Sequence, residues 1–245
     1  MPAGRRRYAA LGAALGVVLA VAAGTAGGAT SPESGDWAAW GNTPDQIRHT
    51  SLTQIDKDNV DKLGRLYTVD FRQIDPSIRR GTQSYPLAIG GRLYVTTNDD
   101  NVFALNAVTG EVIWRWKPDN VAIFRNFGIA ASRGVAYCRG KLYIATLDMF
   151  LVSIDARTGK LVRRVPISAA VPRATPSYGY SETSPPVCAD GRVVVGAAGS
   201  EYGVRGFVMA YTTDLKPAWS EPMGIFSGIE EYSSRADELT RGLTG

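Results

Sequence analysis

The sequence predicts an all-β protein, a β-propeller of four-stranded antiparallel blades that is incomplete, with about three blades present. Two observations predict this fold. A strand-forming motif recurs at intervals of about fifty residues, and a turn motif occupies a fixed place within the repeats. The chain has 245 residues, of which 44% are hydrophobic and 9% aromatic, so apolar side chains suffice for a core.

Each repeat begins with a glycine, a basic residue and a run of aliphatic or aromatic residues. The three copies start at Gly91, Gly140 and Gly191, which are 49 and 51 residues apart. An apolar stretch precedes each glycine, and a second apolar run follows, as at 102–105 and 151–154. β-branched and aromatic runs between Gly, Asp and Asn turns predict antiparallel strands.

In each of the first two repeats, a turn of the form Asx-x-x-Thr-Gly precedes the last strand; the turns begin at Asn106 and Asp155. Its Asx side chain and Thr hydroxyl can cap the turn backbone, and its glycine allows a positive φ. The third copy departs from this form at 212–216. Trp114 and Trp219 follow the turns, and we expect them to pack between neighbouring blades rather than to contact a substrate.

The regions that flank the repeats differ from them. Three repeats cannot close a ring, because propellers have about four to eight blades, so we expect a fragment or a truncated product. Residues 63–71 predict one additional strand, which lies either apart from the first blade or beside it as an unpaired neighbour. The resulting division is a signal peptide at 1–30, a partial propeller at 31–222 and a non-propeller tail at 223–245, for which a short helix is predicted.

The N-terminal segment predicts export. Arg5, Arg6 and Arg7 precede an uncharged run rich in Ala, Gly, Leu and Val, which is typical of a secretory signal peptide; an uncleaved anchor is the alternative. We therefore expect a periplasmic or extracellular protein with no stable membrane span after cleavage. Without these arginines the net charge falls from +4 to +1, which excludes a basic surface for nucleic acid.

The cysteines occupy nearly equivalent places in successive repeats, which puts them on different sheets. We expect Cys138 and Cys188 to be buried free thiols; a disulfide, which an exported compartment allows, is the alternative. His49 is the only histidine and no Cys-x-x-Cys motif occurs, so a zinc site and a histidine-based triad are excluded.

Several motifs resemble those of pyrroloquinoline-quinone (PQQ)-dependent alcohol dehydrogenases. They are the Trp-Ala-Ala-Trp-Gly-Asn run from Trp37, the Leu-Thr-Gln-Ile-Asp run from Leu52, the blade turn with its following tryptophan, and the Gly-Ala-Ala-Gly-Ser-Glu-Tyr-Gly-Val-Arg-Gly run from Gly196. The resemblance covers residues 36–219 and looks like the N-terminal third to half of an eight-bladed enzyme. It implies oxidation of an alcohol or polyol by hydride transfer to PQQ beside Ca²⁺, with a lanthanide as the alternative ion and a cytochrome as the candidate electron acceptor.

The resemblance also implies a metal ligand and a backbone cradle for the cofactor. Glu201 matches the carboxylate that binds the metal ion, and hard cations require such oxygen ligands. Ala198, Gly199 and Ser200 match the stretch whose backbone amides meet the carboxylates of the cofactor. Small residues at these positions let the backbone approach closely.

Three further side chains are implied as cofactor contacts. Arg133 matches an arginine at the polar edge of the quinone, a role suited to its forked donors. Thr146 matches a hydroxyl donor to a cofactor carboxylate. Gln83 stands where the family usually carries a glutamate that holds the cofactor.

The chain also departs from the family pattern. Phe127 and Gly128 stand where many members carry adjacent cysteines. The stacking tryptophan, the second metal ligand and the catalytic aspartate of the family would all lie beyond residue 219. The alternative function is therefore a non-catalytic propeller that acts as a protein-binding scaffold, or an inactive truncated product.

Overall fold

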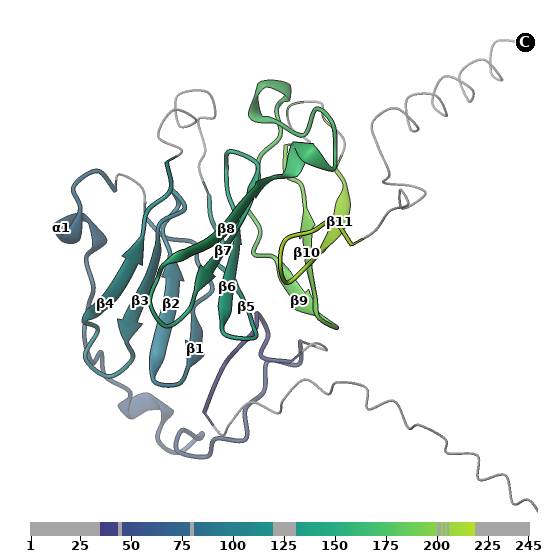
Figure 1. Ribbon diagram of the computed structural model, residues 1–245. Helices are drawn as coiled ribbons and strands as arrows, with labels where there is room; N and C mark the ends of the chain where they lie inside the picture. The colour runs from purple at the N-terminus through teal and green to yellow at the C-terminus, as the bar shows by residue number, and fades with distance from the viewer. Residues whose placement is uncertain are drawn as a thin grey trace, which may run out of the picture. The chain divides into compact units, whose positions relative to one another are not determined.

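The computed structural model describes residues 35–43, 46–78, 81–119, 131–199, 202, 204 and 206–218. Within these residues, eleven strands form three separate sheets, and every strand pair is antiparallel (Figure 1). In each sheet the neighbouring strands are consecutive in the chain. The predicted all-β fold of three successive propeller sheets is confirmed.

The first two sheets have four strands each, as the repeats predict. The first sheet contains β1 (Leu87–Ile89), β2 (Arg92–Thr96), β3 (Val102–Asn106) and β4 (Val112–Trp116). The second contains β5 (Ala136–Cys138), β6 (Lys141–Ala145), β7 (Phe150–Asp155) and β8 (Leu161–Pro166). The repeated glycines, Gly91 and Gly140, have positive φ in the turns that join the first two strands of each sheet.

The third sheet has three described strands: β9 (Val187–Ala189), β10 (Arg192–Gly196) and β11 (Val208–Thr212). The repeat predicts a fourth strand after β11. At that place the structure has a single antiparallel bridge, between Tyr211 and Pro217. Trp219, the signal peptide at 1–30 and the tail at 223–245 lie outside the described residues.

The helical segments in the described part of the chain are all short. They are η1 (Val60–Lys62), α1 (Phe71–Ile74), η3 (Ile167–Ala169) and η4 (Pro176–Tyr178). None of the helices in the described part of the chain is long and apolar enough to cross a membrane.

The strand predicted at 63–71 is wrong, because this segment is irregular up to Asp70, the N-cap of α1. No strand of the described residues pairs with it. Instead, Tyr67 lies against the turn of the first sheet, where its hydroxyl donates to the carbonyl of Ala107 at 2.9 Å. A Cβ on Gly110 would lie 2.6 Å from the Tyr67 ring, so the ring rests directly on that turn.

Trp114 packs between neighbouring sheets, as predicted. It lies on β4, and its indole Nε1 donates to the carbonyl of Ala156 in the turn of the second sheet at 3.1 Å. A Cβ on Gly159 would lie 2.6 Å from the indole ring. The second-sheet turn therefore receives Trp114 in the way that the first-sheet turn receives Tyr67.

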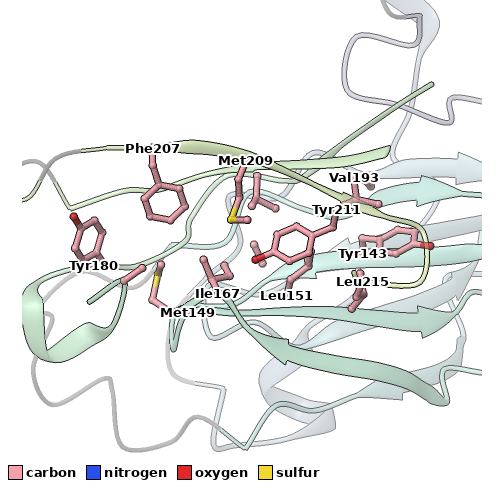
Figure 2. Close-up of a cluster of buried hydrophobic side chains, with 14 of the residues drawn as sticks. Tyr143, Met149, Leu151, Ile167, Tyr180, Val193, Phe207, Met209, Tyr211 and Leu215 are labelled. Carbon is pink, nitrogen blue, oxygen red and sulfur yellow. The ribbon is translucent and has the colours of Figure 1, made fainter. Parts of the chain in front are cut away.

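A large apolar core joins the second and third sheets. Figure 2 shows side chains from both sheets pointing toward one another, among them Leu151 and Tyr143 from the second sheet and Val193 and Tyr211 from the third. All four are at most 1% exposed. A second cluster, which includes Tyr94 and Trp114, joins the first sheet to the second.

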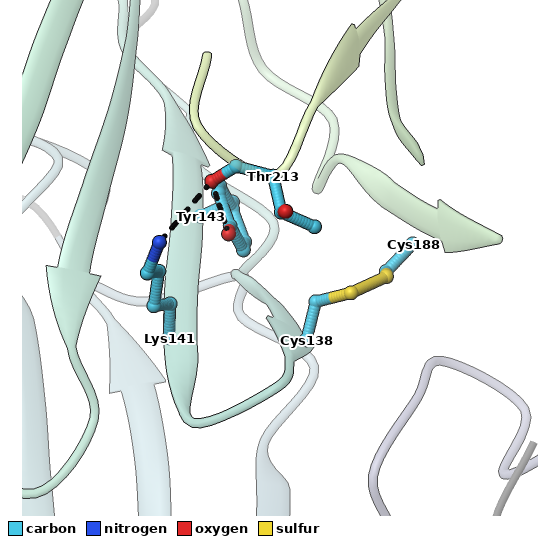
Figure 3. Close-up of a disulfide and its surroundings, with 5 residues drawn as sticks. All are labelled: Cys138, Lys141, Tyr143, Cys188 and Thr213. Atoms are coloured by element: carbon cyan, nitrogen blue, oxygen red, sulfur yellow. Dashed lines mark hydrogen bonds between the residues drawn. A yellow bond between two sulfur atoms is a disulfide. The ribbon is translucent and has the colours of Figure 1, made fainter. Parts of the chain in front are cut away.

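The expectation of two free thiols is wrong. Cys138 on β5 and Cys188 on β9 form a disulfide, with their Cα atoms 6.0 Å apart (Figure 3). The two residues do lie on different sheets, as the repeat predicts. Since β5 and β9 are in contact, equivalent positions on them come close enough to be bridged.

Candidate functional site

An entry segment precedes the first strand of each sheet, at 81–86 before β1, 131–135 before β5 and 181–186 before β9, and hydrogen bonds join the first to the second and the second to the third. The amide of Tyr85, before β1, donates to the carbonyl of Arg133 at 2.9 Å. The amide of Arg133, before β5, donates in turn to the carbonyl of Thr183 at 3.0 Å. Three sheets thus bring their entry segments together in one row.

Arg133 and Thr183 form the centre of this row. The Arg133 guanidinium donates through Nη1 to the Thr183 hydroxyl at 2.7 Å, and both residues are half-buried. The next residue, Gly134, has a φ of 132°, and a Cβ there would lie 3.2 Å from the carbonyl oxygen of Tyr85. The glycine therefore permits the close approach of the two segments that carry Tyr85 and Arg133.

Ala198 and Gly199 contact the segment that leads to Thr183 through backbone atoms. Ser181 and Ala198 form a two-bond bridge, with N–O distances of 3.2 and 2.8 Å. Gly199 has a φ of 123°, and a Cβ there would lie 2.2 Å from the carbonyl oxygen of Gly179. Only glycine fits that position, so the small residues of the motif serve a close backbone contact.

Gln83 lies in the entry segment of the first sheet with an exposed side chain. Its neighbours fix the segment to the end of β2: the Thr82 hydroxyl donates to the carbonyl of Thr96 at 2.6 Å, and the Ser84 hydroxyl accepts from the Thr96 amide at 3.0 Å. Gln83 is thereby placed two residues from Tyr85, in the row of entry segments.

Thr146 is engaged elsewhere. Its hydroxyl bonds to the carboxylate of Asp148 and to the carbonyl of Phe150, inside the β6–β7 turn. Thr97, 49 residues earlier, makes the same contact with Asp99 in the first sheet. Because the repeat reproduces this contact, the structure indicates a turn-stabilising role for Thr146, and a cofactor contact from it stays a prediction.

Two predicted site residues, Ser200 and Glu201, lie outside the described residues. In the part of the chain that the structure describes, no group of three or more His, Cys, Asp or Glu side chains could hold a metal ion. The metal ligand therefore stays a prediction.

Sequence reasoning missed Thr183. A signal for it exists: polar residues precede β9 just as Ser132 and Arg133 precede β5. It also missed Glu182, which is 1% exposed and whose pKa is raised well above its ordinary value by burial.

A cavity of about 520 Å³ lies beside the entry segments. Its lining includes Trp40, Tyr85, Arg133, Tyr137, Pro186 and Cys188. The wall is mainly aromatic and aliphatic, with the Arg133 guanidinium as its cationic group. Such a concave surface suits a flat organic molecule that carries negative charge.

Comparison with known proteins shows a consistent set of relatives. A family model described as PQQ, the β-propeller domain of glucose, ethanol and alcohol dehydrogenases, matches residues 37–215. The dehydrogenase subunit of alcohol dehydrogenase (quinone) from Gluconobacter oxydans (strain 621H) is 35% identical over 182 residues, covering 74% of this chain and 23% of that protein. The 1-butanol dehydrogenase (cytochrome c) of Thauera butanivorans is 35% identical over 184 residues, covering 72% of this chain and 24% of that protein.

Solved structures show the same likeness. The quinohemoprotein alcohol dehydrogenase from Comamonas testosteroni matches with a TM-score of 0.67 at 28% identity, over 78% of this chain and 28% of that one. A europium-containing methanol dehydrogenase matches with a TM-score of 0.65 at 27% identity, over 76% of this chain and 32% of that one.

The chain spans about a quarter of the length of the curated relatives that it matches. The matched region covers all three sheets and includes the motifs on which the predicted resemblance depends. That resemblance is confirmed, and the chain belongs to the PQQ-type β-propeller family of glucose, ethanol and alcohol dehydrogenases.

Proposed function

We propose that the protein acts as an exported quinoprotein dehydrogenase that oxidises an alcohol or a polyol with PQQ beside Ca²⁺, a lanthanide being the alternative ion. The observation that carries this proposal is the hydrogen bond between the side chains of Arg133 and Thr183 in the row of entry segments. Thr183 lies two residues from Ser181, which pairs with Ala198. Relatives named for alcohol oxidation support the substrate class.

The residues present fit an anionic, planar cofactor. The Arg133 guanidinium has donors beyond the one that binds Thr183, and a fork of donors suits a carboxylate. The tight Gly179–Gly199 contact holds the backbone of 198–199 in a fixed loop. In the proposal, Arg133 and Thr183 hold the cofactor by side chains, Ala198, Gly199 and Ser200 by backbone amides, and Glu201 binds the metal ion.

The chemistry supplied with PQQ bound is two-electron oxidation of the alcohol by hydride transfer, which the metal ion assists as a Lewis acid. The chain's own residues orient the acceptor for that transfer. Arg133 is held by Thr183 through both its backbone amide and its guanidinium, so little freedom is lost when an anion binds. A cytochrome is proposed as the electron acceptor, because relatives are named quinohemoprotein or cytochrome c-linked enzymes.

The test is a titration of the purified full chain with PQQ and Ca²⁺, followed by fluorescence quenching. Arg133→Ala and Thr183→Val are each expected to weaken PQQ binding about tenfold or more, because each removes a hydrogen bond that involves a charged group. Glu201→Gln is expected to remove the dependence of PQQ binding on Ca²⁺.

Two controls make this test specific. Arg157→Ala removes an exposed arginine from the 155–159 turn and is expected to leave PQQ affinity unchanged. Thr146→Val separates the two threonines: a loss equal to that of Thr183→Val would return Thr146 to the site. Unchanged binding in Arg133→Ala and Glu201→Gln would contradict the cofactor site and favour a scaffold.

A further inference from the structure

Glu182 carries a buried carboxyl that has no hydrogen-bonding partner among the residues that the structure describes. It is 1% exposed, and neither of its oxygens, Oε1 nor Oε2, has a partner among the described residues. Its two neighbours are firmly held, since Ser181 pairs with Ala198 and Thr183 binds Arg133. Glu182 therefore stands at the middle of the segment that joins these two contacts.

The described residues around Glu182 offer no countercharge, and burial is the cause of its raised pKa. It lies near Tyr211 on β11: burial first, and the proximity of the Glu182 carboxyl second, raise the pKa of that tyrosine to about 12. The apolar core between the second and third sheets contains two further titratable side chains, Tyr143 on β6 and Tyr180 near Glu182. The residues that β5, β7, η3, β9 and β10 contribute to this core are apolar or disulfide-bonded. The hydroxyls of Tyr180 and Tyr211 also have no partner in the described part of the chain.

An ionised carboxylate in such a core is far less stable than a neutral carboxylic acid. We infer that Glu182 is kept as a neutral acid between the second and third sheets and forms a pH-sensitive latch. When it ionises, the side chain leaves the core for water, and segment 181–183 loosens its bonds to Arg133 and Ala198. The geometry that carries this inference is the unpartnered carboxyl itself and the anchored residues on either side.

The direction of the pH effect follows from proton linkage. In the unfolded chain, Glu182 ionises near the ordinary glutamate pKa of 4.5, whereas burial keeps it protonated in the fold to higher pH. Between these two pKa values the unfolded chain binds one proton fewer, so the folding equilibrium constant falls about tenfold for each pH unit. Above the pKa of Glu182 in the folded state, both states are ionised, so stability no longer changes with pH through this group.

Denaturant unfolding of the full chain at a series of pH values tests the latch. Glu182→Gln has nearly the same shape and cannot ionise, so its stability profile is expected to lack this slope. Relative to the wild type, its folding equilibrium constant should rise about tenfold per pH unit above about pH 5. Glu111→Gln, at an exposed glutamate in the β3–β4 turn, is the matched control and should follow the wild type. Parallel profiles for wild type and Glu182→Gln would overturn the inference.

Hydrogen exchange at single amides tests the local opening. In the wild type at alkaline pH, the amides of Arg133, Ser181 and Ala198 should be at least about tenfold less protected than in Glu182→Gln at the same pH, because those amides bond across the latch. The amides of β3 serve as an internal reference and should agree between the two proteins. Equal protection of the three latch amides in both proteins would refute the local opening.

An infrared measurement keeps the inference testable if the variant folds poorly. The wild type at neutral pH should show the carbonyl band of one protonated carboxylic acid that is shielded from hydrogen exchange. Its absence would mean that Glu182 is ionised in the fold, which contradicts the latch.

Discussion

At the scale of single residues, the glycines of the Asx-x-x-Thr-Gly turns are the points where one sheet receives an aromatic side chain from its neighbour. Gly159 has a φ of 73°, and a Cβ atom at this position would lie 2.6 Å from carbon atoms of the Trp114 ring. Two demands therefore act at this position: a left-handed backbone, and space for the indole. The sequence motif predicts the first demand, and only the packing of two sheets shows the second.

Gly159→Ala is expected to destabilise the fold more than Gly140→Ala. Both glycines have a similar positive φ, but nothing lies within 4 Å of a Cβ at Gly140. The difference between the two losses isolates the contact with Trp114 and should be about 1 to 3 kcal/mol, the usual effect of overpacking. Denaturant unfolding of both variants measures it. In a Trp114→Ala background the difference should vanish; if it persists, the indole is not its cause.

The site itself could be predicted only in part at this scale. Arg133, Ala198 and Gly199 lie on or beside the row of entry segments, as the motifs indicate. The motifs indicate Thr146 and give no sign of Thr183, which stands in the polar run 181–184. What separates them is a three-dimensional fact: the Arg133 side chain reaches across a sheet boundary to Thr183.

A charged cluster at the edge of the first sheet leads to a pH prediction. Asp75, just after α1, is held by Arg115 at 2.7 Å and by Lys117 at 3.2 Å, both near the outer strand β4. Hydrogen bonds from Ser77 first, then from Arg115, keep the pKa of Asp75 well below its ordinary value. The carboxylate therefore stabilises the fold above the ordinary aspartate pKa, and this contribution is lost as pH falls through the lowered one.

Asp75→Asn is expected to be less stable than the wild type at neutral pH. The gap should narrow as the pH falls below about 4, because the unfolded wild type then takes up a proton on Asp75 while the folded carboxylate is still ionised. Thermal melting of both proteins across this range measures the gap. Asp58→Asn removes an exposed aspartate paired only with its neighbour Lys57, and should change little. A gap that is constant with pH would mean that the charge of Asp75 is not what stabilises the fold.

At the scale of elements, the strands were predictable and their connections were not. Each repeat motif became a strand pair because its β-branched and aromatic residues are buried, and the interior strands β3 and β7 are covered on both faces of their sheets. Residues 63–71 have strand-like composition but pair with no described strand, so the segment lies against a turn through Tyr67 instead. Local propensity cannot show whether a partner strand is present.

The disulfide between β5 and β9 is also a property of how two elements meet. Equivalent positions in a repeat predict different sheets, but whether the thiols touch depends on the spacing between neighbouring first strands. Oxidised and denatured protein should therefore show no free thiol with a thiol reagent. Two reactive thiols would restore the original expectation.

Removing the disulfide should weaken the junction of the second and third sheets. The double variant Cys138→Ala and Cys188→Ala is expected to lose about 4 kcal/mol of unfolding free energy, since the bridge spans a sequence separation of 50 residues. Denaturant unfolding measures this loss, and reduction of the wild type should reproduce it. A reductant should have no effect on the double variant, so any change there would point to a cause other than the disulfide.

At the scale of the whole molecule, one hydrogen bond is repeated at each junction. The second residue of a turn offers its carbonyl to a tyrosine hydroxyl from the preceding unit: Ala107 accepts from Tyr67, Ala156 from Tyr94, and Thr213 from Tyr143, the last shown in Figure 3. The basic residues that open the first two repeats add a further donor: Arg92 donates to the carbonyl of Ala156 at 3.3 Å, and Lys141 to that of Thr213 at 3.4 Å. The repeat in sequence thus encodes the junctions between sheets as well as the sheets themselves.

If each junction is an independent unit, the effects of removing these hydroxyls must add. Tyr67→Phe should lose about 1 kcal/mol, the usual net value of a hydrogen bond. Tyr94→Phe and Tyr143→Phe should each lose less, because the Ala156 carbonyl keeps its bond from Trp114 and the Thr213 carbonyl keeps its bond from Lys141. Denaturant unfolding of the three single variants and the triple variant tests this, and the triple loss should equal the sum within about 0.5 kcal/mol. A triple loss well above the sum would show that the three junctions form one cooperative structure, in which weakening one sheet boundary weakens the next.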